Sequence, residues 1–302
     1  MATTVTAPVG NVIALAEKYL PILDEIYKVE SRSAILDTAA ERVRWDGAKK
    51  AYLFSTEMVG LGNYDRNAGF VPGDVTTGWE DYEITQDRGR SFLIDVMDND
   101  ETLGMAFGTL VGEFQRTQEV PELDAYRFAK YASGAAVSQI KTETPTASTI
   151  VGLIDDATAT LDDAEVPYEG RILFVNPNTY KLIKGGITRM VMNDDRNVNY
   201  NVDIYNDMRV ITVPTGRFNT AVTINAPTTS SGAGGYTASG NAINYMIIHP
   251  SAVLQVVKHV VPRIFSPEVN QEADAWKFDY RVYHDCWVKD QKTNGIYVSH
   301  AA

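Results

Sequence analysis

The stretch Val120-Pro-Glu-Leu-Asp-Ala-Tyr-Arg-Phe-Ala129 predicts the second half of a long helical element. Pro121 suits the first turn of a helix because the N–H that proline lacks would have no partner there, and Glu122 is favourable beside the positive end of the helix dipole. Gly134 is a good residue with which to end the helix. One face of the helix carries side chains at helical spacing: Leu123, Tyr126 and Lys130.

A second motif, Asp98-x-x-Glu101, lies upstream and resembles a capping box with aspartate in the place of serine or threonine. It predicts the start of the same long element. After it, apolar side chains recur at helical spacing, which predicts a stripe that is buried against another part of the fold. The members of this stripe are Leu103, Phe107, Leu110 and Phe114.

Residues 42–98 change to a period of two, which is typical of strands. One run has Tyr52 and Phe54 at alternate positions, and the run 92–96 alternates in the same way. Between the two runs lie a further strand-like segment at 79–84 and residues 60–73, which are dense in turn formers, so a long two- or three-stranded excursion is predicted. An isolated hairpin is only marginally stable in water. Because this one is rich in aromatic residues, we expect it to lie on another surface.

Residues 12–36 carry apolar side chains at helical spacing, among them Leu15, Tyr19 and Ile26. Charged residues fill the opposite face, so the segment predicts one or two amphipathic helices, with Pro21 as a helix start or a kink. The apolar face of such an arm requires a partner surface to cover it.

The middle of the chain, residues 146–257, alternates predicted helices and strands, which is typical of an α/β or α+β domain. Residues 226–242 are rich in Thr, Ser and Gly and are expected to form a flexible surface loop. At the carboxyl end, residues 278–288 and 296–298 are expected to be two strands joined by an Asn-Gly turn. The expected elements of the middle are helices over 146–161 and 176–186, the second stopped by Gly185-Gly186, and strands over 171–175, 208–213 and 244–248.

The composition excludes several functions. The 27 Lys and Arg against 39 Asp and Glu give a net charge of −12, so the chain as a whole offers no basic surface for sequence-specific DNA binding. One cysteine, Cys286, excludes an internal disulfide. No stretch approaches the roughly 20 apolar residues of a membrane span. No phosphate-binding loop or dinucleotide-binding glycine motif occurs, so no cofactor is expected.

The candidates for catalysis are weak. Consecutive strand residues point to opposite faces, so Asp285 cannot orient His284 as the base for Cys286. We expect a core cysteine beside a surface or interface histidine, and neither a catalytic nor a metal site. The alternative from another class is an acidic α/β hydrolase that uses one of three aspartate pairs. These pairs, which lack the spacing of a calcium loop, are residues 155–156, 162–163 and 194–195.

The chain resembles the major capsid proteins of tailed bacteriophages, which share the Hong Kong ninety-seven-type fold. The resemblance covers almost the whole chain and rests on the order of arm, hairpin, long helix and terminal strands. The stretches that carry it are Arg44-Trp-Asp-Gly47, Asn63-Tyr-Asp-Arg-Asn-Ala-Gly-Phe70, Trp79, residues 85–102, the stretch 120–129, Trp276-Lys-Phe-Asp-Tyr-Arg-Val-Tyr-His-Asp285 and Gly295-Ile-Tyr297.

The resemblance implies an α+β fold and a structural protein without enzymatic activity. It implies assembly as hexamers and pentamers into an icosahedral head that encloses double-stranded DNA without sequence specificity, in a virion assembled in the host cytoplasm. The alternative within the fold is an encapsulin-like compartment shell. The implied parts are an N-terminal arm (1–41), an extended E-loop hairpin (42–98), a P-domain with the spine helix (99–145), an A-domain (146–257) and P-domain return strands (258–302).

The implied partners are other copies of the chain, a portal and a possible decoration protein, with no membrane. Because the arm begins within the first dozen residues after Met1, a separate scaffolding protein is expected as well. The spine-helix core is expected at Leu103, Phe107, Leu110 and Phe114. Aromatic residues and arginine are enriched at interfaces, so the expected contacts between subunits are Tyr64, Asp65, Arg66, Phe70, Trp79, Arg88 and Arg90, with Leu15, Tyr19 and Ile26 of the arm.

The same hairpin residues have another interpretation within one chain. Tyr64 and Phe70 can fold back onto their own hairpin. Asp87, Arg88, Arg90 and Asp95 can form ordinary cross-strand ion pairs, each contributing under ~1 kcal/mol.

Overall fold

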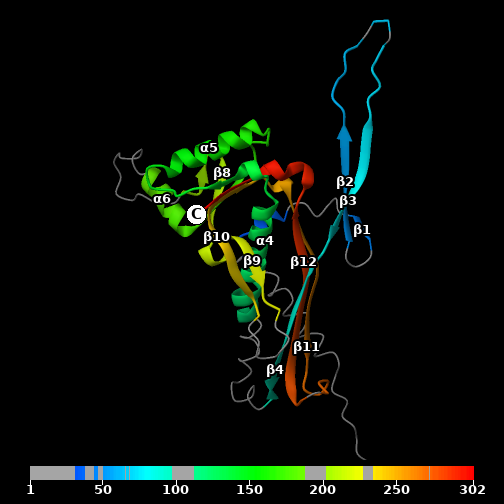
Figure 1. Ribbon diagram of the computed structural model, residues 1–302. Helices are drawn as coiled ribbons and strands as arrows, with labels where there is room; N and C mark the ends of the chain where they lie inside the picture. The colour runs from blue at the N-terminus through cyan, green and yellow to red at the C-terminus, as the bar shows by residue number, and fades with distance from the viewer. Residues whose placement is uncertain are drawn as a thin grey trace, which may run out of the picture.

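Figure 1 shows the computed structural model of the chain. Within the residues that it describes, the strands form three separate sheets, and the long helix α4 (Val120–Gly134) lies between two of them (Figure 1). No helix among these residues is long and apolar enough to cross a membrane. The described residues are 31–37, 44–46, 50–64, 66–67, 69–96, 112–187, 202–226, 234–271 and 273–302.

The largest sheet has seven strands and mixes parallel with antiparallel pairs. Helices α5 (Ile150–Asp163) and α6 (Pro177–Ile187) cover one face, where Leu161, Leu173 and Tyr245 are fully buried. In order across the sheet the strands are β5 (Ile140–Thr142), β13 (Ile296–His300), β10 (Tyr236–Ile248), β6 (Ile172–Val175), β8 (Met208–Thr212) and β7 (Ile204–Tyr205), and β9 (Asn219–Ile224) pairs with β10.

Helix α4 (Val120–Gly134) covers the other face of this sheet, which confirms the helix predicted from residues 120–129. The ring centroid of Phe128 lies 5.2 Å from that of Phe174 and 5.1 Å from that of Phe218. At the end of the helix, a Cβ on Gly134 would come within 2.6 Å of Val288. Glycine therefore allows the helix to end close against a second sheet.

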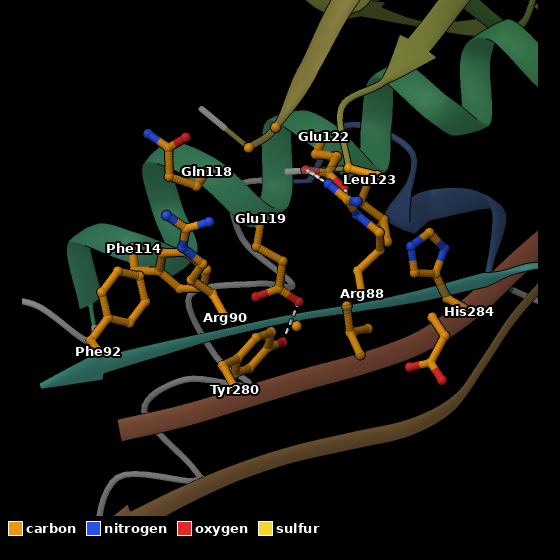
Figure 2. Close-up of a pocket in the computed structure, with 16 residues that line it drawn as sticks. Arg88, Arg90, Phe92, Phe114, Gln118, Glu119, Glu122, Leu123, Tyr280 and His284 are labelled. Carbon is orange, nitrogen blue, oxygen red and sulfur yellow. Dashed lines mark hydrogen bonds and ion pairs between the residues drawn. The ribbon is translucent and has the colours of Figure 1, made fainter. Parts of the chain in front are cut away.

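The second sheet has three antiparallel strands in the order β11-β12-β4. Its strands are β11 (Val253–Phe265), β12 (Ala275–Val288) and β4 (Gln86–Asp95). In β12 the side chains of Phe278, Tyr280 and Val282 are buried at alternate positions. Buried and less buried side chains thus alternate along this part of β12, as expected of a strand that is covered on one face. The helical run 112–134 lies over the covered face (Figures 1 and 2).

The third sheet is a hairpin that projects from the rest of the molecule (Figure 1). It consists of β1 (Arg44–Asp46), β2 (Lys50–Met58) and β3 (Val75–Glu83), all antiparallel. Only Ile84 and Thr85 separate β3 from β4, so one continuous chain segment joins the hairpin to the three-stranded sheet. This confirms the extended hairpin expected from the period of two, but the expected run 92–96 lies outside it, because β4 pairs with β12 in the second sheet.

A buried carboxylate attaches the start of the described chain to α4. Asp124 is fully buried and accepts hydrogen bonds from the hydroxyls of Ser31 and Ser33, both at 2.7 Å, and from the backbone N–H of Arg32 at 3.0 Å. The guanidinium of Arg127, one turn further along, donates to the Ser33 hydroxyl at 3.0 Å. These bonds hold residues 31–37 in place, and Leu36 is fully buried in the main core.

Two expectations about loops and turns were wrong. Residues 226–242 are not all loop, because β10 begins at Tyr236 and pairs with β9. The carboxyl-terminal strands β12 and β13 do not form a hairpin, because a 3₁₀ segment, Asp290–Gly295, takes the chain from one sheet into the other.

The helix expected to stop at Gly185-Gly186 instead continues to Ile187. A Cβ on Gly186 would lie 2.9 Å from Val151 and 3.1 Å from the Ala147 carbonyl oxygen. This glycine lets α6 approach α5 closely and does not act as a helix stop.

Several expected residues lie outside the described residues. They are the arm residues Leu15, Tyr19 and Ile26, the hairpin residue Asp65, the stripe residues Leu103, Phe107 and Leu110, and the capping motif at 98–101.

Asp124→Ala should lower the free energy of unfolding by about 3–5 kcal/mol, because it leaves the donors of Ser31, Arg32 and Ser33 and the Arg217 guanidinium without their acceptor. Urea unfolding followed by circular dichroism measures this. Asp156→Ala removes an exposed carboxylate from α5 and should change the same free energy by less than about 0.5 kcal/mol. Equal unfolding midpoints for the two variants would contradict the role of Asp124.

Candidate functional site: the hairpin tip and the helix-sheet cleft

The tip of the hairpin exposes apolar side chains. Phe70 is 88% exposed, and Leu61 is fully exposed. The ring centroids of Tyr64 and Phe70 lie 4.9 Å apart, so the two aromatic residues contact each other while both remain in solvent. Exposed apolar side chains gathered in one place are typical of a surface that binds a partner. The apolar members that are more than half exposed are Met58, Val59, Leu61, Tyr64, Phe70, Val71 and Val75.

Two other expected contact residues lie on the same hairpin. Arg66 is exposed at its tip, and Trp79 is half exposed on β3. Trp79 pairs in register with Phe54 of β2, well away from the tip. The structure therefore brings Tyr64, Arg66 and Phe70 together and places Trp79 further along the arm.

The base of the hairpin is fixed by one buried carboxylate. Asp285 of β12 accepts hydrogen bonds from the N–H and the hydroxyl of Thr85, both at 2.8 Å, and from the Tyr126 hydroxyl of α4 at 2.8 Å. Ile84, the preceding residue, packs in a small apolar cluster with Leu254 and Val256. The direction in which the hairpin leaves the body is thus set by bonds to both the sheet and the helix.

A cleft of about 560 Å³ lies between the helical run 112–123 and strands β4 and β12 (Figure 2). One end is apolar, where the Phe114 ring lies 4.9 Å from that of Phe92 and 5.8 Å from that of Tyr280. Phe114, the one described member of the expected stripe, is therefore packed on the three-stranded sheet. The polar residues that line the cleft are Asp87, Arg88, Arg90, Gln118, Glu119, Glu122, Tyr280 and His284.

An ion pair spans the cleft. Arg88 of β4 donates from Nε and Nη2 to the two carboxylate oxygens of Glu122, at 2.6 Å and 3.3 Å. Both side chains are mostly buried, so the pair ties the edge strand to the first turn of α4. Arg90 points into the same cleft two residues further along β4 (Figure 2). The expected roles of Arg88 and Arg90 between subunits stay predictions.

Burial in the cleft raises the pKa of one side chain, Glu119, and lowers the pKa of another, His284. Burial raises the pKa of Glu119 to about 7, although hydrogen bonds from Tyr280 and Gln115 lower it. Burial lowers the pKa of His284 to about 3, and the charges of Arg127 and Arg88 lower it further. At neutral pH His284 is therefore uncharged, and Glu119 is poised between its two states.

The fold resembles capsid structures over most of its length. The capsid of the cyanophage P-SCSP1u is 12% identical with a TM-score of 0.63, over 86% of this chain and 85% of that chain. The mature capsid of bacteriophage PhiM1 is 12% identical with a TM-score of 0.59, over 85% and 83%. The chain has the major capsid protein fold of tailed bacteriophages.

A virus-like particle from Pyrococcus furiosus shares this capsid fold as well. It is 13% identical with a TM-score of 0.54, over 94% of this chain and 99% of that chain. No protein-family profile matches the sequence, and no curated protein is significantly similar to it.

Cys286, His284 and Asp285 are all buried on β12. Cys286 is fully buried in the main core, where burial raises the pKa of its thiol to about 12. His284 is also buried, so the expectation of a surface or interface histidine was wrong: residues of β12 that face the helical run are covered by it. Asp285 binds Thr85 and Tyr126, and no hydrogen bond joins it to His284 among the described residues.

The aspartates of the two described pairs bind different partners. Asp155 accepts from the Tyr205 hydroxyl at 2.7 Å, and Asp162 binds Arg171 at 2.6 Å. No cluster of potential metal ligands occurs among the described residues, and the pair at 194–195 lies outside them.

Sequence reasoning missed the buried acids of the capsid fold, Glu119, Asp124 and Asp285. Asp124 falls in the middle of a helix whose neighbours at 123 and 126 are apolar and buried. A carboxylate on the apolar side of a predicted helix was the available signal, because such a group needs several donors when it is buried.

Arg88→Ala should lower the free energy of unfolding by about 2 kcal/mol, because it leaves Glu122 mostly buried without its two donors. Arg281→Ala is the matched control. Arg281 makes the same two-point contact with Asp87, at 2.8 Å and 2.5 Å, but on the exposed face of the same sheet. Its loss should leave the urea midpoint unchanged. A larger shift for Arg281→Ala than for Arg88→Ala would overturn this assignment.

Proposed function

We propose that the protein is a structural major capsid protein that assembles as hexamers and pentamers into an icosahedral head. The observation that carries the proposal is the projecting hairpin with its exposed apolar tip, in a fold shared with phage capsids. The body of the subunit has its own buried cores. The hairpin tip contributes to none of them and needs a neighbouring subunit to cover it.

A closed shell gives every copy of the hairpin such a neighbour. In a ring of identical subunits, each tip meets the same surface of the next copy, so one contact repeated by symmetry buries all tips. Among the described residues, those proposed to contact the neighbouring subunit are Tyr64, Arg66, Phe70 and Trp79. The contacts expected from the arm belong to the same proposal, as does the division of the chain into five parts.

Double-stranded DNA is the proposed content of the head. The net charge of −12 suits a container, because a strongly cationic wall would retain DNA through counterion release. The proposed partners are a separate scaffolding protein, a portal and possibly decorating subunits, with assembly in the host cytoplasm and a purely structural role in the virion.

The second candidate is an encapsulin-like compartment shell. Its support is the virus-like particle from Pyrococcus furiosus, which this chain matches over 99% of that chain. The two candidates share the shell and differ in its content. Nucleic acid extracted from particles purified from an infected host would support the phage head, and a discrete protein cargo without DNA would support the compartment.

The double variant Leu61→Ser, Phe70→Ser should fold with an unchanged unfolding midpoint, because both side chains are exposed, but should not form closed shells. Electron microscopy and sedimentation of the purified protein measure assembly. Val137→Ser is the control, since Val137 is 89% exposed but lies outside the hairpin. Normal shells from the double variant would contradict a role for the tip in assembly.

A further inference from the structure

Glu119 is an unusual residue to find in the cleft. It is only 9% exposed, it accepts a hydrogen bond from the Tyr280 hydroxyl on β12, and its Oε2 has no hydrogen-bond partner. A buried carboxylate with one oxygen unpaired is costly when it is ionised. The side chain is therefore held in a place that favours its protonated form.

The backbone around Glu119 is also irregular. Residues Gln115–Glu119 form a π-helical turn directly before α4. Such turns are rare, occur mostly as single turns within α-helices, and are frequent at functional sites. Glu119 is the last residue of this turn, so its side chain connects the irregular turn of the helix to the three-stranded sheet.

The charged and titratable groups around Glu119 come from three elements. The helical run contributes Glu122, which is paired with Arg88 of β4. Strand β4 contributes Arg90, and β12 contributes Tyr280 and the neutral His284 (Figure 2). Arg88 and Glu122 already form an ion pair, and the Tyr280 hydroxyl donates a hydrogen bond to Glu119.

We infer that Glu119 is a proton-operated latch that closes the π-helical turn against β12 when protonated and releases it when ionised. The inference goes beyond the proposed function and does not depend on assembly. Loss of the proton places a charge next to Glu122 in a largely buried site. Opening of the cleft relieves this cost because water then reaches the carboxylate.

The sign of the pH dependence follows from the two states. The pKa of Glu119 is raised to about 7 in the closed state, against the ordinary 4.5 when it is solvated. The closed state is therefore favoured fully below pH 4.5 and loses this advantage as pH rises through 7. The pKa of His284 is lowered to about 3 in the closed state, so protonation of this histidine favours the open state as pH falls below 6.5. This dependence is opposite to that of Glu119, so the Glu119 effect must be isolated by substitution.

Hydrogen exchange of the full-length protein, with amides of residues 115–123 followed from pH 5 to 8.5, tests the latch. Glu119→Gln keeps the shape of the protonated side chain and an acceptor for Tyr280. The ratio of opening constants, wild type over Glu119→Gln, should rise about fifty- to a hundredfold between pH 5 and 8, and level off above pH 7.

Two further variants sharpen the test. Glu113→Gln removes an exposed carboxylate from the same helical run and should show the wild-type pH profile. Tyr280→Phe removes the hydrogen bond that lowers the pKa of Glu119, so the levelling should move to a higher pH. A pH-independent ratio between wild type and Glu119→Gln would overturn the latch, whatever the outcome of assembly experiments.

Discussion

The structure depends on one constraint: a single helix, α4, is buried between two sheets while it carries charged side chains. Asp124 and Arg127 are both fully buried, and each bonds to the segment 31–37. Tyr126 reaches Asp285 at the base of the hairpin. Because buried charges require partners in fixed positions, these bonds determine where the arm end, the hairpin and the three-stranded sheet stand relative to the helix.

This arrangement divides the molecule into a self-sufficient body and a dependent extension. Both faces of the seven-stranded sheet are covered within one chain. The hairpin has a rigid base at Thr85 and Asp285 but an apolar tip at Leu61 and Phe70 that no described part of the subunit covers. A rigid base lowers the conformational entropy that a contact at the tip must overcome, which favours association of preorganised subunits.

Local patterns in the sequence predicted the elements that depend on residue spacing and turn formers. The helix at residues 120–134, the buried strand at 172–175 and the hairpin follow from spacing and turn formers, and the order of parts supported the capsid fold. Tertiary pairing decided the rest. Thr237 and Ser239 belong to a strand because β9 pairs with them, although their composition suits a loop. The partners of Asp124 and Glu119 lie about 90 to 160 residues away, beyond the reach of any local pattern.

The central claim is that the hairpin tip is an assembly contact of a shell-forming subunit. Cryo-electron microscopy of the purified wild-type protein at increasing concentration tests it most directly. The account predicts closed shells in which residues 59–74 of each subunit are buried against another subunit. Particles that remain monomeric at every concentration, or shells in which this tip faces solvent, would contradict it.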